Sequence, residues 1–535
     1  MVNNEMVAAH LAGNWYTTAF FTPHRKSMFY LLASCIALLL GPLCYRLIAN
    51  GNGLQKGLDG FIFVSLGGLV LIHILPELLA HGGVLSLLFV VLGLWGPTAS
   101  EKLFHRYSEL THNLTLVLGI GGLMLHTITD GGAMVLASQG NGTALLALGV
   151  VLHRLPVGLA IWWLLKPQIG ARWTLAILLS MMLLTALGYF GGAHIIEQLS
   201  LENTVYLQAF VTGSILHVVL HQPHGESSND DNRHEYQAGI GSLLGMALLF
   251  VLLAVADGGH EHEHHGSDQL LHWLMQLSPA ILLAYAVAAL RFRFGIQPGT
   301  SNNALAWLQR LAGPEALVLT AWMLGPVYAL AQAVGLLLLG TVFSTAEVKP
   351  VDPHGKIPNK ALVFGFSHLV DRSAPWVLLS LVLANLIGHP SVPLANPWLQ
   401  AAVLVVVLLP MRFCNLGGAV LAMSLAFSGW SAPAVLLALL AAPWLSLRQL
   451  SVMSLPVKVG ALALLGALLA VGAKLAPEAS PLFHLPHDLE WVAMALLALL
   501  FAASLLRLGP RKFLRRLWHG REAKAHHHPH GHHHH

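Results

Sequence analysis

The sequence predicts an all-α, polytopic α-helical membrane protein with about 14–16 membrane segments. The chain has 535 residues, of which 56% are hydrophobic and only 10% are charged. Soluble domains carry about 25% charged residues, because their surface must be solvated. Apolar stretches recur along the whole chain at about the 20 residues that an α-helix needs to cross a bilayer. These stretches lack the period-2 alternation of a membrane β-barrel.

The apolar stretches form two groups of expected helices. The first group lies near residues 29–49, 58–81, 84–97, 113–138, 144–165, 173–194, 204–221 and 238–256. The second group lies near residues 279–290, 316–343, 361–387, 397–411, 413–428, 432–447, 455–474 and 490–507. Gly325 and Pro326 lie at the middle of the stretch 316–343. They predict a broken helix or a hairpin of two short helices there.

A polar segment between the two groups predicts a domain boundary. The expected domains are an eight-helix membrane domain (1–256), a His/Glu-rich loop (257–278), a second membrane domain (279–510) and a basic, then His-rich tail (511–535). The loops joining the first eight helices carry lysine and arginine in one alternating set only, and this set is expected to face the cytoplasm. We expect an integral protein of the bacterial inner (plasma) membrane, with its N-terminus outside.

The numbers and positions of histidine and cysteine indicate which kinds of metal site and cross-link the chain can form. The chain has 32 histidines, several of them inside apolar stretches, but only three cysteines. The cysteines show no CxxC pairing, so neither a disulfide framework nor a thiolate zinc site is expected. Two interpretations of Cys414 stay open, a soft metal ligand and a small buried hydrophobe. The formal net charge of +4 does not indicate a nucleic-acid partner.

Four apolar stretches contain ionisable side chains that are costly at bilayer depth. Such a side chain costs at least about 2.5 kcal/mol, so each one is a candidate functional residue. His126 and Asp130 are four residues apart and therefore share one helix face. His153 precedes the helix-perturbing Pro156 by about one turn. Two more stretches carry pairs at the four-residue spacing, His73 with Glu77 and His217 with His221.

Imidazole nitrogen combined with carboxylate oxygen is the ligand set of zinc and related divalent ions. A lone buried histidine is more often a satisfied hydrogen-bonding residue. Here, however, four apolar stretches contain at least one histidine each, and this favours a metal pathway. A proton relay through the same residues is the physical alternative. The sequence predicts metal ligands at His126, Asp130 and His153, with secondary ligands at His73, Glu77, His217 and His221.

The stretches 113–138 and 145–165 resemble the fourth and fifth helices of the ZIP (Zrt/Irt-like) family of divalent-metal transporters. The family patterns there are HNxxDG and HExPHE, and the matching residues are His126, Asp130, Gly131, His153 and Pro156. The resemblance covers about residues 25–256. It implies an eight-helix domain that carries zinc, iron, manganese or similar ions, usually towards the cytoplasm, through ligands on those two helices.

The chain departs from this family pattern at three places. Thr127 replaces the asparagine, Arg154 replaces the first glutamate, and Val157 and Gly158 replace the later His-Glu pair. The resemblance therefore implies a two-metal site that has lost several ligands and in which Arg154 places a positive charge beside the remaining ones. A site reduced to the three predicted ligands would hold one ion, with water or another side chain completing it.

The polar segment and the second half carry further candidates. The loop 257–278 contains a tract rich in histidine and glutamate, which faces outside in the assigned orientation. Such tracts either collect zinc, copper or nickel ions or form a solvated linker. The stretch 364–447 shows P-x-x-x-C, G-x-S and A-x-P around Cys414 and resembles predicted permeases linked to metal and metalloid efflux. The expected ligands for ion capture in the loop are His260, His262, His264 and His265.

We therefore expect a secondary transporter of divalent metal ions, with zinc favoured and iron, manganese, nickel and cobalt compatible. The sequence lacks the GxxxxGK[ST] motif that would indicate an ATP-driven pump. The membrane stretches also lack the HExxH motif that would indicate a zinc peptidase. The expected partners are metal ions and the lipid bilayer, with no nucleic acid, and a homo-oligomer stays open. Two alternatives remain, an efflux permease working in the opposite direction and a non-transporting metal sensor or scaffold.

Overall fold

The computed structural model confirms the predicted fold class, because the described residues form helices and no strands. It describes residues 28–46, 52–103, 144–198, 201–220, 235–257, 265–296, 301–345, 360–388, 395–483, 485–518 and part of 117–134. Six helices among them are long and apolar enough to cross a membrane, and five shorter apolar helices accompany them. The chain is therefore an all-α polytopic membrane protein.

The chain divides into two compact units, Met1–Glu263 (unit 1) and His264–His535 (unit 2). The division falls within the His/Glu-rich segment 257–278. The second part of this segment is not a loop, because helix α8 spans His265–Arg293. The expectation that this helix begins near residue 279 was therefore wrong. The first turns of α8 are polar, so the apolar pattern did not indicate that they are helical.

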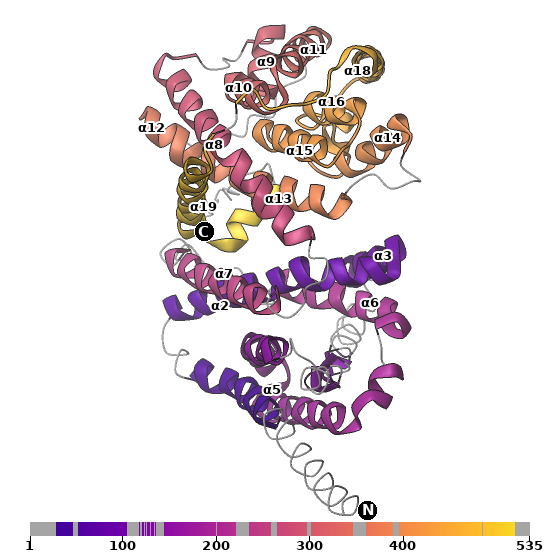
Figure 1. Cartoon of the computed structure of the whole chain (residues 1–535), viewed down its shortest axis with the longest axis vertical. Helices are drawn as coiled ribbons and strands as arrows, with labels where there is room; N and C mark the ends of the chain where they lie inside the picture. The colour runs from indigo at the N-terminus through magenta and orange to yellow at the C-terminus, as the bar shows by residue number, and fades with distance from the viewer. Residues whose placement is uncertain are drawn as a thin grey trace, which may run out of the picture. The chain divides into compact units, whose positions relative to one another are not determined.

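Unit 1 consists of paired helices (Figure 1). The structure places α3 against α6 and α2 against α7. Its elements are the helix Met28–Arg46, α2 (Asn52–Leu69), the π-helical turn η1 (Val70–Ile74), α3 (Leu75–Leu103), α5 (Ala144–Gln198), α6 (Leu201–Leu220) and α7 (Glu235–Asp257). The described residues between positions 117 and 134 are helical as well.

Glycines in the left-handed region interrupt two long helices of unit 1. Gly83 in α3 has a φ of +58°, and Gly170 in α5 has a φ of +82°. Side chains with a Cβ rarely adopt this conformation, whereas glycine does so without strain. Gly83 lies between the helices expected at 58–81 and 84–97, and Gly170 lies between those expected at 144–165 and 173–194. The expected boundaries are therefore confirmed at the level of the backbone.

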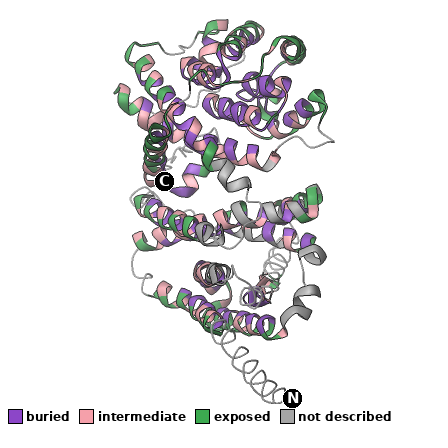
Figure 2. Ribbon diagram, in the orientation of Figure 1, coloured by how far each residue is buried: buried purple, intermediate pink, exposed green. Residues whose placement is uncertain are grey.

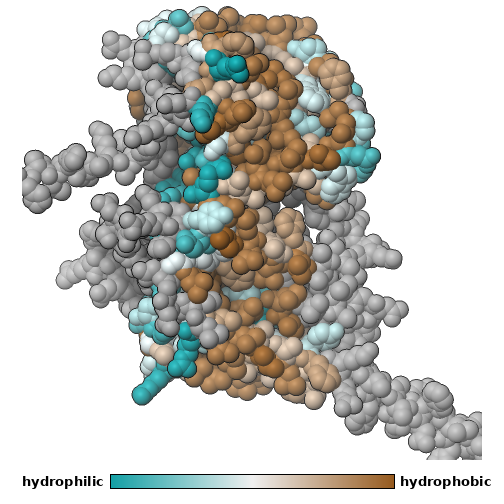
Figure 3. Space-filling model, turned by 90° about the vertical axis from the view of Figure 1, so that its left-hand side faces the viewer, coloured by the Kyte–Doolittle hydropathy of each residue, from teal (hydrophilic) through white to brown (hydrophobic). Residues whose placement is uncertain are grey.

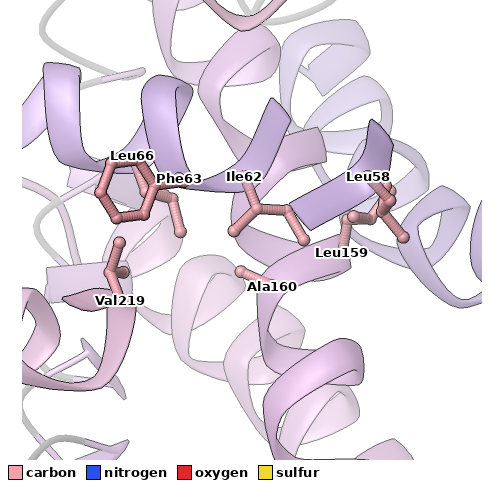
Figure 4. Close-up of a cluster of buried hydrophobic side chains, with 7 residues drawn as sticks. All are labelled: Leu58, Ile62, Phe63, Leu66, Leu159, Ala160 and Val219. Carbon is pink, nitrogen blue, oxygen red and sulfur yellow. The ribbon is translucent and has the colours of Figure 1, made fainter. Parts of the chain in front are cut away.

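A buried apolar cluster anchors α5 just after His153 (Figure 4). The side chains from α2 are four residues apart or adjacent, so they face α5 and α6 from one side of their helix. The cluster consists of Leu58, Ile62, Phe63 and Leu66 from α2, Leu159 and Ala160 from α5, and Val219 from α6. It packs the part of α5 that follows His153 against α2 and α6.

Large apolar side chains also lie on the outside of both units. Trp173, Phe190, Leu455 and Leu475 are between 69% and 73% exposed. Exposed positions line the outer faces of many helices, and hydrophobic residues cover much of the surface in view (Figures 2 and 3). Soluble proteins rarely expose apolar surface on this scale, whereas a bilayer covers it.

Unit 2 contains two long helices at its ends and shorter helices between them. They are α8, α9 (Ala304–Leu311), α10 (Gly313–Leu324), α11 (Pro326–Ser344), α12 (Ala361–Val363), the π-helical turn η3 (Phe364–Leu369), α13 (Val370–Ile387), α14 (Pro397–Leu408), α15 (Asn415–Phe427), α16 (Ala432–Ala441), α17 (Leu447–Val452), α18 (Leu455–Leu475) and α19 (His487–Trp518). Gly325 has a φ of +95° and separates α10 from α11. This confirms the predicted break at Gly325-Pro326. The sequence did not predict α9 and α17.

The centre of unit 2 is formed by α15 and α16, which are buried along almost their whole length. Neighbouring helices pack against them from several sides (Figure 1). A polar contact at the start of α15 ties three helices together. Glu315 accepts hydrogen bonds at 3.0 Å from Arg291 Nη1 and from Asn415 Nδ2. The charge of this buried carboxylate is therefore compensated inside the unit.

Candidate metal centre

Three of the predicted ligands converge in unit 1. One ligand atom from each of His126, Asp130 and His153 lies within 4.8 Å of the other two. His126 Nε2 lies 3.6 Å from Asp130 Oδ1, and His153 Nε2 lies 3.3 Å from Asp130 Oδ2. The two imidazoles thus approach different oxygens of one carboxylate. This is a mixed nitrogen and oxygen donor set of the kind that zinc accepts.

Direct backbone contacts position Asp130. A Cβ placed on Gly131 would overlap the carbonyl oxygen of Thr185, and one placed on Gly188 would overlap that of Ile128. The helix that carries Asp130 and the second part of α5 therefore touch backbone to backbone. Small residues permit such close approach between membrane helices. The adjacent glycine thus lets the helix that carries Asp130 pack closely against α5.

The three ligands differ in accessibility. The His126 side chain is 40% exposed, whereas those of His153 and Asp130 are 13% and 10% exposed. His126 is therefore the most accessible of the three ligands. An ion that reaches the centre from the side of His126 contacts His126 before the two more buried ligands.

Arg154 also reaches the centre. Its side chain is 1% exposed, and its Nη2 lies 3.0 Å from Asp130 Oδ2. The same nitrogen donates a hydrogen bond to Thr185 Oγ1 at 3.0 Å and lies 3.5 Å from the carbonyl oxygen of Thr127. Within the described residues, Arg154 Nε and Asp130 Oδ2 have no hydrogen-bond partner. The contact with Asp130 is therefore an ion pair without hydrogen-bond geometry.

Helix packing explains the departure at Gly158. A Cβ placed on Gly158 would overlap the carbonyl oxygen of Leu38, and one placed on Gly41 would overlap the backbone of Gly158. The helix Met28–Arg46 occupies the volume that a side chain at position 158 would need. A glutamate at this position would force the two helices apart. The final glutamate of the family's ligand pattern therefore has no room at position 158.

His217 has a structural environment of its own. It is 6% exposed, and its Nδ1 lies 2.9 Å from the carbonyl oxygen of Leu94. This contact joins α6 to α3. The described ligand cluster does not include His217. The structure thus gives this residue a hydrogen bond between helices rather than a place beside Asp130.

Cys414 precedes α15 and caps it. Its Sγ accepts a hydrogen bond from the backbone nitrogen of Gly417 at 3.2 Å. Among the described residues, no cluster of three metal-ligating groups includes this cysteine. The geometry favours the structural interpretation of Cys414, because the thiol satisfies a free donor at the helix start.

The remaining predicted ligands cannot be placed as side chains. The backbone at His73 forms the π-helical turn η1, and Glu77 lies at the start of α3. π-Helical turns are frequent at functional sites. The predicted residues whose side chains lie outside the described part of the chain are His73, Glu77, His221, His260, His262, His264 and His265.

Thr185 is the residue of this centre that the sequence did not indicate. A threonine in an apolar helix usually donates to the carbonyl four residues earlier, and Thr185 does so to Met181 at 2.8 Å. Its further role as the acceptor for Arg154 depends on the helix crossing. The charged Arg154 earlier in α5 is the one signal in the sequence that a polar partner is required.

Comparison of the chain with protein-family models, with curated proteins and with solved structures finds no match. The resemblance to the ZIP family therefore rests on the matching motif residues alone and stays a prediction.

Proposed function

We propose that unit 1 is a secondary transporter of divalent metal ions and that His126, Asp130 and His153 bind the ion in transit. The convergence of these three side chains, from two separate apolar segments, carries the proposal. Ionisable side chains at membrane depth are costly, so a cluster of them needs a compensating function. Two imidazoles and one carboxylate are a common ligand set for a divalent ion that retains a water ligand.

Zinc is the favoured substrate. It accepts nitrogen and oxygen ligands in tetrahedral geometry, and a site with three protein ligands leaves a fourth position for water. Iron, manganese, nickel and cobalt ions use the same donor atoms and are further substrates of the proposal. The ion gradient supplies the driving force, and the bacterial inner membrane is the proposed location. Uptake is the direction that the family resemblance suggests.

The ion pair of Asp130 favours a second candidate function. Arg154 supplies a full positive charge to the carboxylate that an ion would need. A centre that binds an ion only transiently and does not pass it on would act as a membrane metal sensor. Zinc binding without zinc flux distinguishes this sensor from a transporter.

Flux of radioactive zinc into proteoliposomes tests the proposal. We expect the double variant His126→Ala/Asp130→Ala to reduce the initial rate at least tenfold, because even the hydrogen-bonding partners of metal ligands contribute about 10–100-fold to metal affinity. The matched control is His487→Ala/Asp488→Ala, which removes an exposed histidine and aspartate from α19. This control should transport zinc at the rate of the unaltered chain.

Three outcomes decide between the alternatives. Equal flux in the double variant and the unaltered chain shows that the proposed pathway is wrong. Zinc binding by the unaltered chain without any flux supports the sensor. Expression in cells decides the direction, and a lower zinc content in expressing cells contradicts uptake and supports efflux.

A further inference from the structure

We infer that Arg154 is a tethered competitor of the metal ion, which occupies Asp130 between binding events and promotes release of the ion. The inference rests on the proposed metal site, and it assigns a role to the residue by which this chain departs most from the ZIP pattern. Arg154 would thereby set both the affinity of the centre and the rate at which an ion leaves it.

The competition concerns one oxygen atom. Asp130 Oδ2 lies 3.3 Å from His153 Nε2 and 3.0 Å from Arg154 Nη2. An ion that joins His153 to Asp130 would bind this oxygen at about 2.0–2.2 Å. It would therefore lie within about 5 Å of the guanidinium group, at the ligand distances usual for zinc. The ion and the guanidinium group would be close neighbours with charges of the same sign.

The charges of the centre disfavour simultaneous contact of the metal ion and the Arg154 guanidinium group with Asp130. The charges of Asp130 and Arg154 compensate each other before an ion arrives. A divalent ion adds two positive charges where Asp130 is 10% and Arg154 is 1% exposed. Water screens the repulsion poorly at such burial. Arginine does not lose its proton in proteins, so the repulsion is relieved when the guanidinium group moves away.

Two acceptors besides Asp130 already contact the guanidinium group. Thr185 Oγ1 and the carbonyl oxygen of Thr127 lie 3.0 Å and 3.5 Å from Arg154 Nη2. Arg154 Nε lacks a hydrogen-bond partner among the described residues, so the guanidinium group is not fully bonded in its present position. Arg154 therefore keeps partners when Asp130 turns to the ion. When the ion leaves, the ion pair forms again.

This arrangement suits a transport site. An ion must bind well enough to enter and weakly enough to leave. Two imidazoles and a carboxylate without a competing charge hold zinc firmly. A side chain that returns to the carboxylate lowers the affinity without removing a ligand.

Zinc titration of the purified full chain in detergent, against a competing chromophoric chelator, tests the inference. We expect Arg154→Gln to bind zinc at least about tenfold more tightly, because one unit of opposing charge is removed. In proteoliposomes its KM should fall by a similar factor and its maximal rate should fall as well, because release becomes slower. Arg291→Gln is the matched control, since Arg291 is 10% exposed and is likewise paired with a carboxylate at 3.0 Å. It should leave the zinc affinity unchanged.

A second variant, Thr185→Val, is expected to change the zinc affinity in the opposite direction. Thr185→Val removes an anchor for the displaced guanidinium group but no charge and no metal ligand. We expect zinc affinity to fall about two- to tenfold, the amount of one hydrogen bond, because the bound state depends more on this anchor. A purely structural role for Arg154 would weaken zinc binding in both variants. If Arg154→Gln does not fold, stronger zinc binding by Thr185→Val would still contradict the inference.

The outcomes separate the inference from the proposed function. Equal or weaker zinc binding by Arg154→Gln, with binding by the unaltered chain intact, overturns the inference and leaves the proposed function standing. Stronger binding by Thr185→Val overturns the inference too. No zinc binding by either the unaltered chain or Arg154→Gln overturns both. Binding by Arg154→Gln alone supports the opposition between Arg154 and the ion and contradicts transport by the unaltered chain.

Discussion

Asp130→Asn is expected to destabilise the protein by about 3–5 kcal/mol, because it leaves Arg154 as a buried charge without a counter-ion. Arg154 is 1% exposed, and Asp130 is the carboxylate that the structure places at 3.0 Å from it. Asparagine preserves the size of the side chain, so the change isolates the charge. Chemical unfolding in detergent micelles, followed by tryptophan fluorescence, measures the free energy of unfolding.

A double variant supplies the control for this prediction. Asp130→Asn/Arg154→Gln removes both charges and should recover most of the lost stability, because a buried ion pair can often be replaced by neutral groups at little net cost. Asp488→Asn on the exposed start of α19 should change stability by less than about 0.5 kcal/mol. A loss below about 1 kcal/mol for Asp130→Asn would contradict a compensated buried pair.

Gly131→Val is expected to abolish zinc flux and to cost about 3 kcal/mol or more of stability, since it forces two backbones apart. A Cβ at this position overlaps the carbonyl oxygen of Thr185. The helix would have to move, and Asp130, the preceding residue, would move with it away from His153. The measurements are zinc flux in proteoliposomes and the free energy of unfolding in micelles.

A glycine on the same helical segment provides the matched control. Nothing lies within 4 Å of a Cβ placed on Gly121, so Gly121→Val should retain the fold and the flux. Gly188→Val should behave like Gly131→Val, because the contact is reciprocal. Transport at the normal rate by Gly131→Val would show that this helix crossing does not position the centre.

Local signals in the sequence predicted most helix boundaries. Apolar length marks the helices, because lipid solvates them along their whole span. Glycines mark their breaks, as at Gly83, Gly170 and Gly325, where the backbone adopts a positive φ. The start of α8 at His265 was not predicted, because its first turns are polar. Apolar periodicity reports the membrane-embedded part of a helix and not its full length.

The sequence by itself determined the fold class and the face shared by His126 and Asp130, because apolar length and the four-residue helical spacing are local properties. The sequence also predicted His153 as a third ligand, but only the tertiary structure decided how it and other residues approach Asp130. His153 and Arg154 reach Asp130 across a helix crossing, and Thr185 completes the contact from farther along α5. Crossings depend on backbone contacts such as that at Gly131, which no periodicity reports. For this reason the sequence identified Arg154 only as a departure from a motif. The tertiary structure shows that it is the counter-ion of Asp130.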